Sequence, residues 1–252
     1  FNSLRYLVGF ALLAAIALRP GRWRPTRGEF VGGLVLGVVM AGAAFLQQHG
    51  IPGTTSARAG FFTGLYVLLV PIAGLVLGQR AGISHIAGAA VAAVGLWLLS
   101  GDVSGGLNPG DPYIIGCAVL WAVHVALTGK LAPKADALRL AAVQFAAVFL
   151  ISGVVALCLT SERRMFPTVT DGLLPMLYSG VFVIGVAFTL QIVGQRHSPP
   201  THAAVIMSME AVSAAFFGLV ILRETLNTGE IVGCGFMLAG CLLSQLWPHQ
   251  RT

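Results

Sequence analysis

Residues 202–222, HAAVIMSMEAVSAAFFGLVIL, contain a single acid, Glu210, near the middle of an otherwise uncharged apolar run. A helix needs about 20 such residues to cross the hydrocarbon core of a bilayer. An ionised carboxylate at the centre of that core costs at least about 2.5–3.5 kcal/mol, so it should face a partner or a watery cavity rather than lipid. The segment therefore predicts a membrane helix with a functional acid, as expected of a transport protein.

Similar apolar segments recur along the chain, which is 56% hydrophobic and 10% charged and has a mean hydropathy of +0.86. These values exclude ordinary soluble proteins and predict an all-α polytopic membrane protein. Short loops join the segments, so there is no room for a separate soluble catalytic domain. Nine transmembrane helices are expected, at residues 3–18, 30–49, 58–79, 84–100, 112–130, 138–159, 172–194, 202–222 and 229–246.

The formal net charge of +6 is distributed unevenly over the two sides of the predicted helices. The loop between the first two helices, which we assign to the cytoplasm, holds Arg19, Arg22, Arg24 and Arg27. Basic cytoplasmic loops are the bias that orients membrane proteins, so this charge indicates topology rather than nucleic-acid binding. We expect an integral protein of a bacterial cytoplasmic (inner) membrane, with the lipid bilayer and a small-molecule substrate as its partners.

The sequence shows no catalytic or metal-binding pattern. Neither a disulfide, a metal nor a cofactor is expected, because the cysteines lie inside predicted helices without CxxC or Cys/His spacing. These cysteines are Cys117, Cys158, Cys234 and Cys241. HExxH, GxSxG and a phosphate-binding loop are also missing from the sequence. A membrane-embedded enzyme, and a channel or sensor without carrier activity, are the alternatives to a carrier, although a channel would normally show rings of charge.

An internal repeat relates residues 46–81 to residues 190–225, which align without gaps. After one inserted residue the alignment continues into the next helix. Aligned pairs include Gln47 with Gln191, Tyr66 with Glu210, Gly88 with Gly233 and Gly95 with Gly240. The pairing shifts the helices by five positions, and an odd shift means that the two copies cross the membrane in opposite directions. Such inverted repeats are typical of secondary transporters, whose substrate site lies near the midplane between the halves.

Two inverted five-helix repeats are therefore expected, the first at residues 1–101 and the second at residues 112–246. The first repeat has only four helices in this sequence. We expect one further helix before Phe1, and ten helices in the natural protein.

Two stretches resemble the EamA-type family of the drug/metabolite transporter (DMT) superfamily. Residues 60–78, GFFTGLYVLLVPIAGLVLG, resemble the fourth helix of that family, and residues 203–225, AAVIMSMEAVSAAFFGLVILRET, resemble its ninth helix. The resemblance covers essentially the whole chain. It implies ten helices in two inverted units and movement of small organic metabolites, often amino acids, usually outward. Gln79 and Arg80 stand where the family frequently has an acid, as at Glu224, and we expect them to be interfacial anchors or loop contacts.

Glu210 is the leading site candidate, as the ligand of a substrate ammonium or as a proton carrier. The alternative is a buried protonated acid that bonds a neighbouring helix. Its repeat partner Tyr66 is expected across the same central space, either as a substrate contact or as a packed tyrosine with a satisfied hydroxyl. Thr63 lies near the same helix face as Tyr66, and Pro71 is expected to kink that helix.

Three glutamines are further candidates. Gln47, Gln48 and Gln191 should line the interior or bond another helix, because unpaired amides are unfavourable in lipid. Gln144 and Thr189 are weaker candidates of the same kind.

The helix at residues 112–130 carries a polar stripe of Cys117, Trp121, His124 and Thr128. Trp121 could pack against an aromatic or aliphatic substrate. His124 could relay a proton or offer a stacking surface, and a structural, hydrogen-bonded histidine is the alternative.

Four GxxxG pairs predict close helix contacts. They are Gly33/Gly37, Gly60/Gly64, Gly74/Gly78 and Gly229/Gly233. We assign them to packing within the chain ahead of dimerisation, which leaves a homodimer open.

The sequence thus predicts a secondary transporter, an exporter of small organic metabolites such as amino acids or related compounds. Alternating access is expected around a midplane cavity lined by Glu210, Tyr66, Gln47 and Trp121.

Overall fold

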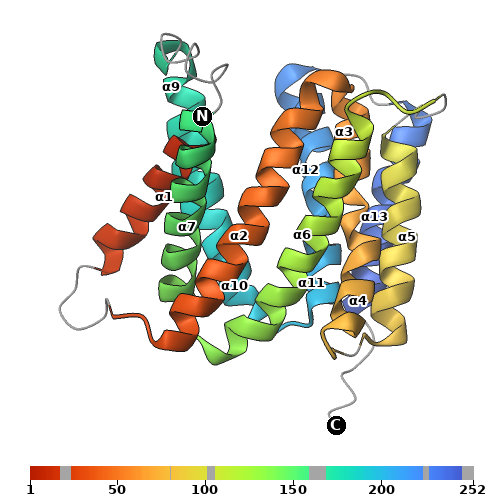
Figure 1. Cartoon of the computed structure of the whole chain (residues 1–252). Helices are drawn as coiled ribbons and strands as arrows, with labels where there is room; N and C mark the ends of the chain where they lie inside the picture. Colours follow the sequence, from red (N-terminus) through yellow and green to blue (C-terminus); the bar gives the residue numbers. More distant parts are fainter. Residues whose placement is uncertain (18–23, 80, 101–105, 159–168, 224–226, 246–252) are drawn as a thin grey trace. The chain divides into compact units, whose positions relative to one another are not determined.

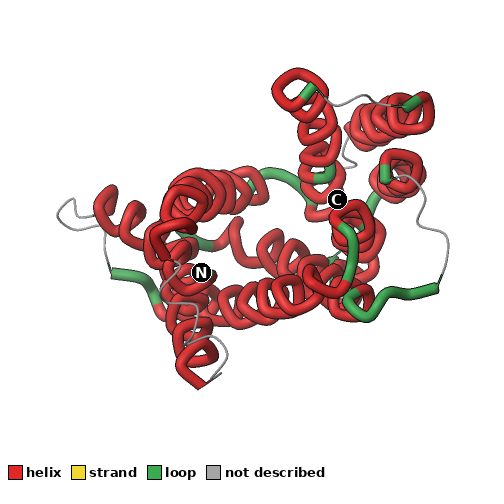
Figure 2. Tube along the Cα trace, turned by 90° about the horizontal axis from the view of Figure 1, so that it is seen from above, coloured by secondary structure: helices red, strands yellow, loops and turns green. Residues whose placement is uncertain are grey.

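The computed structural model describes residues 1–17, 24–79, 81–100, 106–158, 169–223 and 227–245. In this part of the chain every regular element is a helix, as Figures 1 and 2 show. Six spans are long and apolar enough to cross a membrane, namely Arg27–Gly53, Arg58–Val76, Asp111–Lys134, Ala137–Cys158, Gly172–Gln195 and Pro200–Ile221. Three shorter apolar helices, Asn2–Ile16, Ile83–Leu99 and Thr228–Ser244, fall at the other predicted positions. The prediction of an all-α polytopic membrane protein is confirmed.

The helices follow one another with short connections. In chain order they are α1 (Asn2–Ala17), α2 (Arg27–Gly50), η1 (Ile51–Gly53), α3 (Ser56–Gly64), α4 (Tyr66–Val76), α5 (Ile83–Leu99), α6 (Asp111–Leu131), η2 (Ala132–Lys134), α7 (Ala137–Cys158), α9 (Val169–Tyr178), η4 (Ser179–Phe188), α10 (Thr189–Gln195), α11 (Pro200–Met207), α12 (Met209–Phe217), η5 (Gly218–Leu222) and α13 (Thr228–Gln245). The predicted ends at residues 18, 159 and 246, with Arg19, Arg22, Arg80 and Glu224, lie outside the described residues.

Two of the helices that we predicted to be continuous are interrupted. Leu65 separates α3 from α4, and its carbonyl accepts the N–H of Leu68, three residues ahead, at 3.0 Å. Ser208 separates α11 from α12 in the same way, with its carbonyl accepting the N–H of Ala211 at 3.2 Å. Such a tightened turn leaves the apolar pattern unchanged, so hydropathy does not reveal it.

The helix predicted over residues 172–194 is also irregular. It begins as α9, continues as the π-helical η4 and returns to α-helical geometry in α10. Pro175 lies inside α9, where a proline removes one backbone donor.

The chain forms two compact units. Unit 1 comprises residues 1–45 and 128–197, and unit 2 comprises residues 46–127 and 198–252. Each unit contains helices from both predicted repeats.

In unit 1, α1 packs against α7 and η4, while α2 approaches α7 through glycines. A Cβ on Gly37 would lie 2.6 Å from the Cβ of Ala147, and a Cβ on Gly33 would lie 2.6 Å from that of Val143. No side chain fits at either glycine without a shift of the neighbouring helix. The Gly33/Gly37 pair therefore serves a contact within the chain.

In unit 2, α5 and α13 lie side by side (Figure 1). Gly88 faces Gly240 so closely that a Cβ on either residue would lie 2.6 Å from the carbonyl oxygen of the other. Gly95 and Gly233 face each other with the same 2.6 Å approach. Small residues thus set the distance between these two helices.

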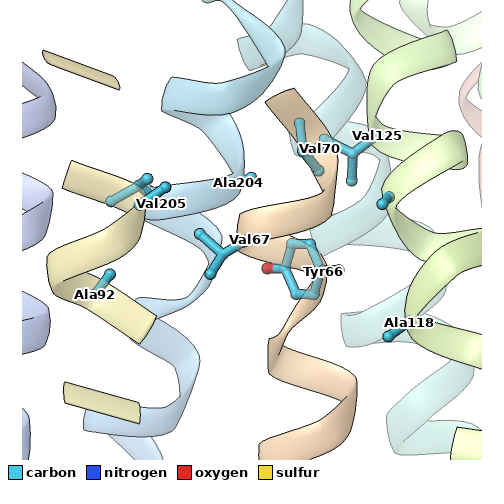
Figure 3. Packing of buried hydrophobic residues seen from close by; sticks show 10 residues of the cluster. Tyr66, Val67, Val70, Ala92, Ala118, Val125, Ala204 and Val205 are labelled. Carbon is cyan, nitrogen blue, oxygen red and sulfur yellow. The ribbon is translucent and has the colours of Figure 1, made fainter. Parts of the chain in front are cut away.

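The core of unit 2 lies between α4, α5, α6 and α11. Its buried members are Tyr66, Val67, Val70, Ala89, Ala92, Ala118, Ala122, Val125, Ala204 and Val205 (Figure 3). Gln79 adds a polar link after α4, because its Nε2 donates to the carbonyl of Ala126 in α6 at 3.0 Å.

Candidate functional site

Glu210 and Tyr66 each follow a helix interruption in unit 2. Tyr66 is the first residue of α4, after Leu65, and Glu210 is the second residue of α12, after Ser208. The Glu210 carboxylate lies close enough to Tyr66 to act electrostatically on its hydroxyl. The structure therefore brings an acid and a phenol together at two interrupted helices.

The two side chains differ in exposure. Tyr66 is only 5% exposed, and its ring lies on the side of α4 that faces Ala118 and Val125 of α6 (Figure 3). Glu210 is exposed and makes no hydrogen bond or ion pair with any described residue.

Thr63 lies one helical turn before Tyr66, on α3. Its Oγ1 is buried, and no described residue hydrogen-bonds to it. A buried hydroxyl without a partner is unfavourable, so this oxygen is available to a bound ligand or to water.

The predicted stripe on α6 faces the interior. Cys117, His124 and Thr128 have no exposed surface, and Trp121 packs against the core of unit 2. The Trp121 and His124 rings meet edge to face, with centroids 5.6 Å apart. Trp121 therefore borders the same core as Tyr66.

The glutamines are distributed over both units. Gln47 and Gln48, near the end of α2, belong to unit 2 and are half-buried and exposed respectively. Gln191 belongs to unit 1, where its Nε2 donates to Oε1 of Gln195 at 3.2 Å. The structure does not gather these three side chains into one site within a single unit.

The remaining candidates have local roles. Gln144 is buried on α7 and donates to Sδ of Met40 on α2 at 3.3 Å, and Thr189 is buried at the start of α10. Pro71 lies inside α4 and leaves the carbonyl of Val67 without its helical N–H donor. The interruption itself falls six residues earlier, at Leu65.

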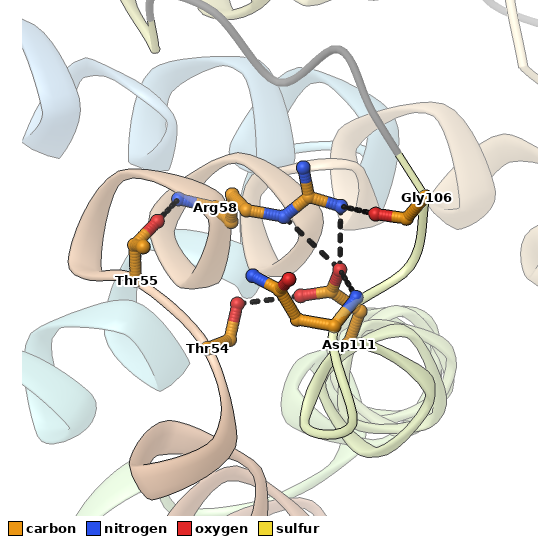
Figure 4. Close-up of polar contacts among 6 residues, drawn as sticks. Thr54, Thr55, Arg58, Gly106 and Asp111 are labelled. Carbon is orange, nitrogen blue, oxygen red and sulfur yellow. Dashed lines mark hydrogen bonds and ion pairs between the residues drawn. The ribbon is translucent and has the colours of Figure 1, made fainter.

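Unit 2 contains a buried ion pair that we did not predict from the sequence. Arg58 of α3 donates to Oδ2 of Asp111 at the start of α6, from Nη2 at 2.6 Å and from Nε at 3.0 Å (Figure 4). Thr54 Oγ1 and the N–H of Asn108 donate to the same carboxylate, and Arg58 also donates to the carbonyl of Gly106. The ion pair links the first turn of α3 to the first turn of α6. The sequence signal for this pair is that Arg58 and Asp111 each stand at the start of a predicted apolar helix.

A second charged cluster lies at the start of α2 in unit 1. Glu29 Oε1 accepts from Nη2 of Arg139 and from the N–H of Asp136, both at 2.9 Å. Its Oε2 accepts the N–H of Thr26 at 2.7 Å, which caps the helix. This cluster joins the starts of α2 and α7.

Comparisons with known proteins agree with this architecture. The profile of the EamA-like transporter family matches residues 1–101 and 108–246. An uncharacterized transporter of Archaeoglobus fulgidus is 29% identical over 247 residues, which are 98% of this chain and 76% of that protein. Two WAT1-related proteins of Arabidopsis thaliana are 30% and 33% identical over 81 residues, 32% of this chain and 22% and 21% of those proteins.

A protein of known crystal structure has a similar fold. It superposes with a TM-score of 0.78 at 21% sequence identity, covering 97% of this chain and 87% of that one. At this identity the likeness concerns the fold alone.

Proposed function

Because the chain belongs to the EamA-like transporter family, it is a membrane transporter, and we propose that it is a secondary exporter of small organic metabolites. Amino acids and related amines are the proposed substrate class. The proposed location is a cytoplasmic membrane, with the basic loop after α1 on the inner side.

The main observation in support of this proposal is the exposed carboxylate of Glu210. Glu210 sits in an apolar span and has no described partner that could neutralise it. A carboxylate in that setting requires a cation, a proton or water. A substrate ammonium meets this requirement, and the Tyr66 hydroxyl, within electrostatic range of Glu210, offers a second polar group.

Alternating access requires two halves that can rearrange about one site, and the inverted repeat supplies them. Two features support the repeat. The interruptions at Leu65 and Ser208 occupy nearly equivalent positions in the alignment, immediately before Tyr66 and Met209. The family profile also matches in two stretches that follow the two predicted repeats closely.

The glycine contacts between α5 and α13 supply a third support. In the alignment Gly88 corresponds to Gly233, and Gly95 corresponds to Gly240. Exchanging each glycine for its counterpart turns the Gly88–Gly240 contact into the Gly233–Gly95 contact, which also exists at the same distance. Contacts that map onto one another in this way are expected around a pseudo-twofold axis.

The test is efflux of labelled amino acids and related amines from proteoliposomes, with and without an imposed pH gradient. We expect saturable flux for at least one compound. Glu210→Gln should lower that flux about ten- to hundredfold, since a hydrogen bond to a charged group is worth about 1.5–3 kcal/mol.

Glu230→Gln is the matched control, because it also removes one carboxylate charge from a membrane helix of unit 2. Glu230 accepts the N–H of Asn227 at the start of α13, and a glutamine oxygen can keep that cap. The control should transport normally. Normal flux in Glu210→Gln would remove Glu210 from the mechanism, whereas product formed from lipids would indicate an enzyme and conductance at fixed potential a channel.

A further inference from the structure

Unit 1 contains an apolar pocket that lies apart from the candidate site. It has a volume of about 270 Å³ and is lined by residues of α1, α2 and α7 and by Pro25. Apart from Arg139, every lining residue is apolar, as are Phe10 of α1 and Ala146 of α7. A pocket with such a lining stays free of water and takes an apolar ligand.

The pocket opens toward the lipid. Phe30, Leu34 and Leu150 line it and are exposed, and all three lie in spans that are apolar enough to cross a membrane. Arg139 and Leu150 are three turns apart on α7, about 16 Å at 1.5 Å per residue. This distance is close to half of the hydrocarbon core of a bilayer, which is about 30 Å thick. The lining therefore extends from the headgroup level at Arg139 toward the midplane, as one acyl chain does.

Arg139 gives the pocket one polar end. Its Nη2 donates to Oε1 of Glu29 at 2.9 Å, which fixes the direction of the guanidinium. Its Nε is buried and has no hydrogen-bond partner among the described residues. A buried donor without an acceptor is unfavourable, so this N–H is available to an oxygen of a bound ligand.

Positive charge is in excess around Arg139. The hydrogen bonds of Glu29 bring together residues 24–29 and 134–139, which hold four basic side chains and two acidic ones. Both acids already accept hydrogen bonds, Glu29 from Arg139 and Asp136 from the N–H groups of Leu138 and Arg139. The surroundings therefore favour an anionic ligand. The four basic residues are Arg24, Arg27, Lys134 and Arg139.

We propose that this pocket is a binding site for an anionic phospholipid, with one acyl chain between α1, α2 and α7 and the phosphate at Arg139. A guanidinium binds phosphate oxygens through charge-assisted hydrogen bonds. Basic pockets between transmembrane helices bind anionic lipid headgroups in this way. The inference involves neither Glu210 nor the transported substrate, so it goes beyond the proposed function and is tested separately from it.

The test is native mass spectrometry of the purified protein in detergent, titrated with phosphatidylglycerol or with phosphatidylcholine of the same acyl chains. We expect phosphatidylglycerol to bind at least about tenfold more tightly, since each basic residue near an anionic headgroup contributes to the attraction. Arg139→Gln should remove most of this preference. Arg24→Gln combined with Arg27→Gln should also reduce it, and these exposed residues lie outside the Arg139–Glu29 ion pair, so the second variant keeps that pair.

Ala146→Phe places a ring in the pocket and should abolish the tight binding of phosphatidylglycerol. Val154→Phe is the matched control, because it adds a ring to an exposed position of α7 outside the pocket, and it should bind this lipid as the unmodified protein does. Leu34→Trp, at an exposed lining residue, replaces Ala146→Phe if that variant does not fold.

Equal affinity of the unmodified protein for the two lipids would overturn the proposal, because the basic end of the pocket would then have no role in binding. Unchanged binding of phosphatidylglycerol in a folded Ala146→Phe or Leu34→Trp would also overturn it, by placing the lipid elsewhere on the protein.

Discussion

Glu210 places a carboxylate, which is charged in water, in an apolar membrane span. The carboxylate is exposed on an apolar span and lies within electrostatic range of Tyr66, whose ring is in the core of unit 2. A rigid phenol next to a carboxylate without a partner favours a cationic ligand with a hydrogen-bonding group. Thr63 adds a buried hydroxyl one turn away.

Tyr66→Phe should weaken substrate binding without disturbing the fold. The substitution removes only the hydroxyl, and a hydrogen bond is worth about 0.5–1.5 kcal/mol, which corresponds to a KM raised about two- to tenfold. Tyr178→Phe, on an exposed tyrosine of unit 1, is the control and should leave KM unchanged. An unaltered KM in Tyr66→Phe would exclude the phenol from the site.

Unit 2 should be sensitive to the loss of one partner of the buried Arg58–Asp111 pair. Arg58→Met leaves the Asp111 carboxylate buried without its cation, which typically lowers the free energy of unfolding by about 3–5 kcal/mol. Replacing both residues, as Arg58→Met with Asp111→Leu, should recover most of that loss. Thermal unfolding in detergent measures both variants, and equal losses in the single and double variants would show that the ion pair is not responsible.

At the scale of the helices, the length of each apolar run was enough to predict a transmembrane helix. A helix needs about 20 apolar residues to cross the hydrocarbon core of the bilayer. The interruptions at Leu65 and Ser208 could not be predicted in this way, because each depends on one backbone hydrogen bond that closes three residues ahead rather than four. Apolar run length also does not predict the hydrogen bond from Gln79 to Ala126 of α6, because that bond depends on how two segments distant in the sequence pack.

The contact between α5 and α13 should tolerate no side chain at its glycines. Gly95→Ala would place a Cβ 2.6 Å from the carbonyl oxygen of Gly233, and such overpacking costs about 1–3 kcal/mol. Gly235→Ala, on α13 with nothing within 4 Å, should instead be neutral or stabilise the helix. Melting temperatures in detergent compare the two, and equal values would refute the close contact.

Pro71→Ala should raise the stability of the protein and lower its rate of transport. Alanine restores an N–H for the carbonyl of Val67 and strengthens α4, whereas a hinge at Pro71, where the kink was predicted, needs that bond to be absent. The melting temperature should rise and the turnover number should fall, with KM little changed. A higher melting temperature with normal turnover would show that Pro71 is not a hinge.

At the scale of the molecule, the predicted repeats and the compact units divide the chain differently. Helices that the alignment pairs share a unit, as α5 and α13 do in unit 2, so each unit contains helices of both predicted repeats. The sequence alignment could pair Tyr66 with Glu210, which the structure places close together. It could not show that Gln191 belongs to a different unit from both residues, because unit membership depends on long-range packing.

The most direct test of a carrier built around Glu210 is exchange in proteoliposomes. External unlabelled substrate should accelerate the release of internal labelled substrate from vesicles that contain the unmodified protein or Glu230→Gln. The reason is that a carrier with bound substrate reorients across the membrane faster than an empty one. Glu210→Gln should lose this acceleration. Release that is insensitive to external substrate, or equal exchange in Glu210→Gln and Glu230→Gln, would contradict the account.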